Sequence, residues 1–85
     1  EVADKVGEVM KKLSDNLQVF SITHLPQVAS KGKHHYYVYK SEDSKVTNTH
    51  IKLLSQSDRV VEIAKMMSGE QPSEATLQSA KELLK

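Results

Sequence analysis

The sequence predicts one small domain of mixed α/β class. Its 85 residues are enough for a single hydrophobic core and too few for two. Apolar side chains recur at helical spacing near both ends of the chain, and three short runs between them are rich in β-branched and aromatic residues, as strands are. The predicted order over residues 1–85 is therefore helix, strand, short helix, β-hairpin, helix and helix.

The first helix is predicted over residues 2–13. Its apolar side chains fall on one helical face: Val2, Val6, Val9, Met10 and Leu13. A strand is predicted next, over residues 17–23, where the side chains are apolar almost without interruption. A strand that is apolar on both faces is typical of a buried parallel sheet.

The middle of the chain is predicted to hold a short helix and a hairpin. Pro26 suits the first turn of a helix that runs through Ala29, and Gly32 ends it. Residues 35–40 and 46–54 are predicted as strands, with the polar residues 41–45 as the loop between them.

Two helices are predicted at the end of the chain. Ser57 is expected to cap the first and Gly69 to end it, and Ser73 is expected to cap the second. The predicted core faces of these helices are Val60, Ile63, Ala64 and Met67 in the first and Leu77, Ala80 and Leu84 in the second.

Composition excludes several classes of function. The chain has no cysteine, so disulfides, thiolate metal sites and a cysteine nucleophile are ruled out. Twelve basic and eleven acidic residues nearly balance, and no apolar run reaches the roughly 18 residues of a membrane span. The first residues lack an initiator Met and a signal peptide, which leads us to expect a piece of a longer protein.

His24 is the strongest candidate for a functional side chain, because it directly follows the predicted strand 17–23. Ligands gather at the carboxyl ends of parallel strands. An imidazole there can donate an N–H to a phosphate oxygen or orient a water, and the Thr23 hydroxyl can add a donor. The alternative is that His24 only caps the strand or bonds the loop backbone.

The other histidines, His34, His35 and His50, do not predict a metal site. Neighbouring residues of a strand point to opposite faces, so His34 and His35 cannot easily share a ligand set with His50. No carboxylates stand at a spacing that would complete three or four ligands.

A different function is suggested by a basic and aromatic segment without nearby acids in the sequence. Lys31, Lys33, Tyr36 and Tyr37 are the side-chain types that hold single-stranded nucleic acid, with cations on phosphates and rings on bases. The chain would then be a small non-enzymatic binding module. Against this, tyrosines of a hairpin often pack into a core and lysines before a strand are usually solvated.

The string VFSITHLPQVA, residues 19–29, resembles the carboxyl-terminal segment of the RecN family, bacterial DNA-repair ATPases related to SMC proteins and to ABC-type heads. The resemblance runs from about residue 1 to the end. Four further features agree with it: Val6-Gly7, His34-His35, the pattern Arg59…Glu62-Ile63-Ala64…Met67…Gly69, and Ala75-Thr76…Ala80…Leu83-Leu84.

The resemblance implies the C-terminal portion of an ABC/SMC-type P-loop ATPase head, in which His24 is the switch histidine that senses the γ-phosphate or the attacking water. It places Thr23 and Gln27 beside the nucleotide, without a specific role for Gln27. It also implies a parent protein that binds ATP with Mg²⁺ and acts in DNA double-strand-break repair and recombination, in the bacterial cytoplasm at the nucleoid. Its partners would be DNA, the remainder of the head and a second head, and no membrane.

The chain alone is not expected to bind or hydrolyse ATP. The Walker A lysine, the signature motif, the Walker B acids and the coiled-coil arms of the family are absent, and Gly7, Gly32 and Gly69 are too scattered to form a phosphate loop. Surfaces that the missing lobe normally covers are instead expected to favour self-association of the fragment.

Overall fold

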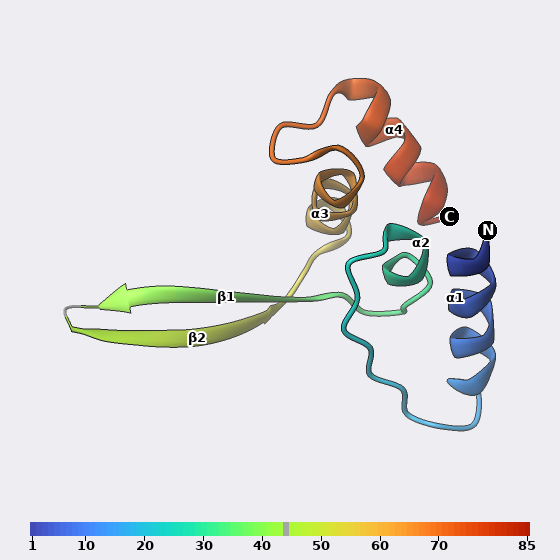
Figure 1. The fold of residues 1–85 in the computed structure, drawn as a ribbon, viewed down its shortest axis with the longest axis horizontal. Helices are drawn as coiled ribbons and strands as arrows, with labels where there is room; N and C mark the ends of the chain where they lie inside the picture. The colour runs from blue at the N-terminus through green and yellow to red at the C-terminus, as the bar shows by residue number, and fades with distance from the viewer. Residues whose placement is uncertain (44) are drawn as a thin grey trace.

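The structure is a computed structural model that describes residues 1–43 and 45–85. Within these residues the chain forms helices and one antiparallel hairpin, so the predicted mixed α/β class is confirmed (Figure 1). In chain order the elements are α1 (Val2–Leu13), α2 (Pro26–Ala29), β1 (Tyr36–Asp43), β2 (Val46–Leu53), α3 (Gln56–Ser68) and α4 (Glu74–Leu83).

The core lies between α3 and α4. Ile63, Ala64 and Ala80 are completely buried there, and partly buried apolar side chains surround them: Ala29, Val60, Met66, Leu77 and Leu84. Ala29 belongs to α2, so the short helix is tied to the same core. The predicted core faces are confirmed except at Met67, which is exposed while its neighbour Met66 packs inward.

The ends of α3 and α4 follow ordinary capping chemistry. The predicted cap Ser57 is wrong, because the Ser55 hydroxyl accepts the hydrogen bond from the Asp58 backbone N–H at 3.2 Å. Gly69 ends α3 as predicted, with a φ of 100° that favours glycine. Ser73 caps α4 as predicted, its hydroxyl accepting from the Thr76 backbone N–H.

Helix α1 has the predicted bounds but uses a different face for packing. Its buried residue is Gly7, which lies against the turn formed by α2. A Cβ on Gly7 would come within 2.9 Å of Lys31 Cγ and 3.1 Å of the Gln27 carbonyl oxygen. The two helices can approach this closely because residue 7 has no side chain. The apolar side chains that share the predicted helical face are largely exposed: Val2, Val6, Val9 and Leu13.

The predicted strand 17–23 is not formed. Residues 18–23 form neither a helix nor a strand, and Phe20 and Ile22 are exposed, Ile22 completely. A segment becomes a β-strand only when a neighbouring strand exchanges backbone hydrogen bonds with it. In the described part of the chain β1 and β2 pair only with each other, so this segment has no neighbour.

The hairpin is longer than predicted and stands apart from the helices. β1 and β2 pair from Tyr36 opposite Leu53 to Asp43 opposite Val46, so much of the predicted loop 41–45 is strand, and residue 44 lies outside the described residues. Figure 1 shows the hairpin projecting away from the helices. The radius of gyration, 14.3 Å, accordingly exceeds the value of about 12 Å for a compact domain of this size.

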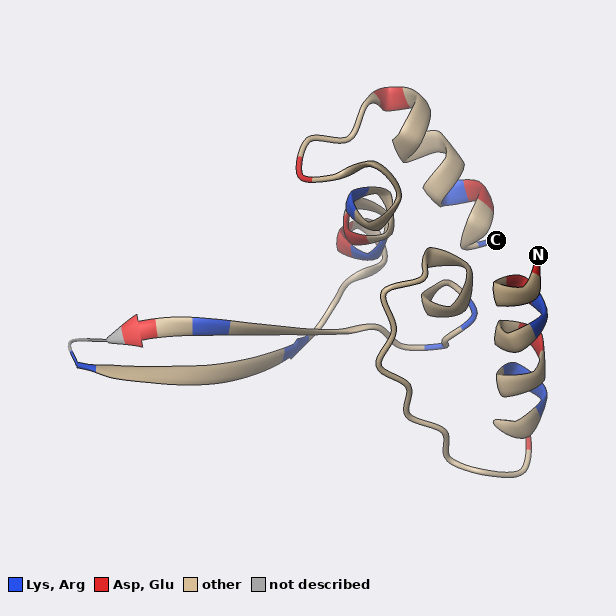
Figure 2. Cartoon of the chain, in the orientation of Figure 1, with Lys and Arg blue, Asp and Glu red and all other residues tan. Residues whose placement is uncertain are grey.

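Charges of both signs occur on α1, α3 and α4, as Figure 2 shows, and on the hairpin they lie at the tip, in the middle of β1 and near the base of β2. None of the helices in residues 1–43 and 45–85 is long and apolar enough to cross a membrane.

Candidate functional site

His24 lies in the turn that joins residues 18–23 to α2. Its side chain is exposed and has no hydrogen-bond partner within the described residues. The turn itself is constrained, because the Leu25 backbone N–H donates to the Thr23 hydroxyl oxygen at 3.0 Å and Pro26 opens α2. The backbone on both sides of His24 is therefore restrained, and the imidazole nitrogens have no partner among the described residues.

His24 does not lie at the end of a sheet strand, as the sequence had predicted. The described residues contain no parallel sheet, so His24 does not follow a sheet strand and no ligand-binding strand edge is formed. Residues 18–23, which form no helix or strand, lead directly to His24. The site is thus an exposed histidine on a fixed turn, without the sheet that would surround it in an α/β head.

Thr23 and Gln27 lie on either side of this turn but face different surroundings. Thr23 is half-buried, and its hydroxyl oxygen holds the turn. Gln27, in the first turn of α2, has a buried amide oxygen that accepts no hydrogen bond from the described residues. A buried acceptor normally has a partner, so this oxygen is available to a donor that residues 1–43 and 45–85 do not provide.

Lys31 is not the free cation that the basic segment predicted. Its Nζ lies 3.4 Å from Asp4 Oδ1 and 3.3 Å from Glu8 Oε1, both on α1. The hydrogen bond to Glu8 raises the pKa of Lys31, as does Asp4. Lys31 thus fastens α1 to the end of α2, and its charge is neutralised there.

The tyrosines of the basic and aromatic segment do not lie on one face of the hairpin either. Tyr36 and Tyr37 are adjacent on β1, so they project from opposite faces of the hairpin and cannot form one platform. Tyr37 instead stacks on Tyr39, with ring centroids 5.8 Å apart, and Tyr39 on His50, at 5.1 Å. The predicted set of Lys31, Lys33, Tyr36 and Tyr37 is therefore not brought together.

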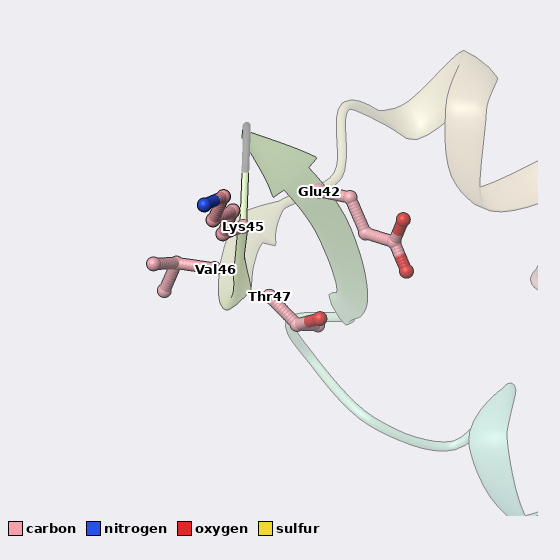
Figure 3. Close-up of a pocket in the computed structure, with 4 residues that line it drawn as sticks. All are labelled: Glu42, Lys45, Val46 and Thr47. Carbon is pink, nitrogen blue, oxygen red and sulfur yellow. The ribbon is translucent and has the colours of Figure 1, made fainter.

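The tip of the hairpin contains a small hollow, shown in Figure 3, that is lined by Glu42, Lys45, Val46 and Thr47. Lys45 and Val46 project from one side of the hairpin, and Glu42 and Thr47 project from the other. Because the two charged groups do not converge, the hollow offers no obvious ligand chemistry.

Arg59, which the sequence analysis named only as part of the family pattern, has a structural role. It is only 8% exposed, and its guanidinium donates to the carbonyl oxygens of Gly32 at 2.8 Å and Lys33 at 3.4 Å. Burial lowers the pKa of Arg59. The side chain joins α3 to the loop between α2 and β1. The signal available in the sequence was an arginine four residues before Ile63, on the core side of α3.

Beside Arg59 lies His35, which is half-buried with an unpartnered Nδ1 in the described structure. Desolvation lowers the pKa of His35, the positive charge of Arg59 lowers it further, and Glu62 partly opposes both effects. His34 is exposed, and His50 lies within 2.6 Å of the Ser41 hydroxyl. In the residues described, no three His, Asp or Glu side chains are grouped as metal ligands would be.

The stability of the fold is expected to fall as the pH is lowered through about 6.5, the ordinary pKa of histidine. Between the lowered pKa of folded His35 and 6.5, the unfolded chain binds more protons than the folded chain, so acid favours unfolding in this window. The slope of the free energy of unfolding against pH is at most about 1.4 kcal/mol per pH unit for one proton, and it is smaller for a half-buried group. Urea unfolding at several pH values should show this slope in the wild type and lose it in His35→Gln. An equal slope in both proteins would exclude His35 as its origin.

The chain is similar to DNA repair protein RecN from several bacteria. It is 50% identical over 84 residues to that protein from Rickettsia bellii, 43% identical over 79 residues to that from Vibrio cholerae, and 44% identical over 79 residues to that from Deinococcus radiodurans. These matches include 99%, 93% and 93% of the chain. No model of a protein family matches it.

The chain spans only about 15% of the length of these relatives. The matches nevertheless cover nearly all of its own residues, and they confirm the resemblance to the C-terminal segment of RecN proteins. The chain therefore matches the C-terminal part of proteins named DNA repair protein RecN.

Proposed function

We propose that this chain is the part of a RecN-type ATPase head that presents the switch histidine, His24, to the terminal phosphate of ATP. The observation that carries the proposal is the exposed, unpartnered imidazole of His24 on a fixed turn, within a chain that is 50% identical to a RecN protein. The parent protein would use ATP hydrolysis in DNA double-strand-break repair, with DNA and a second head as partners.

The turn is well suited to positioning an imidazole. The bond between the Leu25 N–H and the Thr23 hydroxyl oxygen and the ring of Pro26 restrict the backbone on both sides of His24. A donor that is already positioned where charge develops stabilises a phosphoryl-transfer transition state without further reorganisation. The Thr23 hydroxyl proton is not used by the Leu25 N–H and remains a second possible donor.

Gln27 bears on this proposal because its buried amide oxygen has no hydrogen-bond partner among the described residues. An oxygen accepts and does not donate, so it cannot bind a phosphate oxygen directly. A backbone N–H or a water brought by the rest of the head can satisfy it. Through this oxygen, Gln27 would then fix the interface beside His24.

The nucleotide itself must be held mainly by other parts of the protein. Gly7 lies within α1, Gly32 follows α2 and Gly69 ends α3, so they form no loop around a phosphate. When bound, Mg²⁺ neutralises charge on the phosphates, and among the described residues no three His, Asp or Glu side chains are grouped to hold a metal ion. The chain alone is therefore proposed to lack ATPase activity.

Uncovered apolar residues support a place within a larger head. The exposed face of α1 and the exposed side chains of residues 17–22 lie on two consecutive segments of the chain. Such surface is costly to leave in water, and the relatives are several times longer than this chain. The function is tested by measuring the ATP turnover of a polypeptide of full RecN length that contains this chain, with His24 present and with His24 replaced by Ala.

A further inference from the structure

Helix α1 is held to the rest of the described chain by a polar contact with α2. The two helices lie side by side, and α1 makes no comparable contact with another helix or strand in residues 1–43 and 45–85 (Figure 1). Asp4, Gly7 and Glu8 share the face of α1 that meets α2, whereas most apolar side chains of α1 are exposed. The position of α1 relative to α2 therefore depends mainly on charge and on the close approach of the two backbones.

Lys31 makes this contact from the α2 side. Its Nζ lies 3.4 Å from Asp4 Oδ1 and 3.3 Å from Glu8 Oε1, and its Cγ lies 2.9 Å from where a Cβ on residue 7 would stand. The side chain thus crosses α1 at the glycine and places its ammonium group between two carboxylates that are one helical turn apart. Because only 26% of the Lys31 side chain is exposed, salt screens these ion pairs less than it screens fully exposed pairs.

Backbone hydrogen bonds connect Lys31 to the turn that carries His24. The Lys31 N–H donates to the Val28 carbonyl oxygen at 3.1 Å. The N–H groups of Val28 and Ala29 donate to the Leu25 carbonyl oxygen at 3.1 and 3.0 Å, and Leu25 directly follows His24. A shift of Lys31 relative to α1 is therefore transmitted through α2 to the backbone beside His24.

We propose that Lys31 is a positioning residue for His24. Its ion pairs with Asp4 and Glu8 hold α2 on α1, and α2 fixes the turn from which the imidazole reaches the terminal phosphate. The proposal rests on the proposed function and adds the residue that orients the switch histidine. A misplacement of about 1 Å can lower a rate about 10²-fold. Loss of the ion pairs alone leaves the hydrogen bonds of α2 in place, so we expect a smaller displacement.

The test uses Lys31→Met in a polypeptide of full RecN length that contains this chain. Methionine keeps an unbranched stem beside Gly7 and removes the charge. The kcat for ATP hydrolysis, per ATP-binding site, is expected to fall about five- to tenfold. The KM for ATP is expected to change less than about twofold, because the nucleotide is held mainly by other parts of the protein. Lys31→Arg keeps a cation and should restore most of the wild-type kcat.

The same substitution in a His24→Ala background separates positioning from a general structural effect. If Lys31 acts through the imidazole, Lys31→Met should lower kcat further by less than about twofold once His24 is replaced. A loss of folded protein would instead lower kcat by the same factor in both backgrounds.

Lys5→Met is the matched control. Lys5 is an exposed lysine next to Asp4 on α1, and it belongs to none of the ion pairs of the described residues. The substitution removes the same charge and should leave kcat near the wild-type value.

Gly7→Ala disturbs the same contact without a change of charge, and it keeps the proposal testable if Lys31→Met does not fold. The added Cβ would come within 3.1 Å of the Gln27 carbonyl oxygen, which belongs to the backbone of α2, so the two helices must separate slightly. The substitution also favours the helical conformation of α1 itself. A lowered kcat is expected here too, again only where His24 is present.

Three outcomes would overturn the positioning role: a wild-type kcat for Lys31→Met, an equal loss for Lys5→Met, or an equal factor with and without His24. If His24→Ala lowers turnover and one of these outcomes is found, only the positioning role fails. If His24→Ala itself hydrolyses ATP at the wild-type rate, the proposed function fails and the positioning role fails with it.

Discussion

Replacing His24 by Ala in a polypeptide of full RecN length is expected to lower ATP turnover by roughly 10²- to 10³-fold, the usual cost of losing one positioned donor at a transition state. The fold should be nearly unaffected, within about 0.5 kcal/mol, because the side chain is exposed and has no partner in the described structure. Steady-state hydrolysis and urea unfolding of the same preparation measure the two effects.

His34→Ala is the matched control, since His34 is also an exposed histidine and lies beyond α2. It should leave both turnover and stability near those of the wild type. If His24→Ala hydrolyses ATP at the wild-type rate, the imidazole has no part in the reaction and the assignment of the switch histidine is wrong.

Ile63→Ala is expected to produce the largest loss of stability. Ile63 is the largest fully buried side chain in the described part of the protein, and it stands at the centre of the contact between α3 and α4. Truncating a buried isoleucine to alanine costs about 2–5 kcal/mol, a large part of the roughly 5–15 kcal/mol that stabilises a typical domain. Thermal unfolding followed by circular dichroism should show a strongly lowered Tm or no cooperative transition.

The control for this substitution is Val61→Ala on the same helix, where Val61 is 38% exposed. It removes a similar side chain without opening a cavity in the core, and a loss of no more than about 1 kcal/mol is expected. Equal effects of the two substitutions would show that the α3–α4 contact is not the main core.

The sequence predicted elements that are determined by local chemistry. The first helix and the helix after Pro26 have the expected bounds, and Gly69 and Ser73 act as expected at helix ends. The cap of α3 was misplaced by two residues, because Ser55 and Ser57 are both suitable residue types. Only Ser55 has an acidic residue three positions later, the pattern of a capping box.

Features that depend on distant contacts could not be predicted. The apolar run 17–23 indicates a buried strand, but a strand needs neighbours, and the described residues provide none. The polar residues 41–43 indicated a loop, yet they extend β1 because an exposed hairpin tolerates polar side chains. The pairing of Lys31 with Asp4 and Glu8 joins residues more than twenty positions apart, which no local pattern reveals.

The prediction of His24 as a functional residue has two grounds, of which the structure contradicts one. His24 was predicted from the end of a buried strand that is not formed in this chain, and independently from the HLPQVA string, whose resemblance to the RecN family is confirmed by the similarity to RecN proteins. The structure adds the contacts at Thr23, Leu25 and Pro26 that restrain the backbone on both sides of the exposed His24.

The distance from the His24 imidazole to the terminal phosphate, in a nucleotide-bound structure of a full-length RecN-type protein containing this chain, tests the central claim most directly. We expect a ring nitrogen to lie at hydrogen-bonding distance, about 2.7–3.2 Å, from a terminal phosphate oxygen or from a water bound to that phosphate. A ring that points away from the nucleotide, with neither a direct bond nor one bridging water, would contradict the claim.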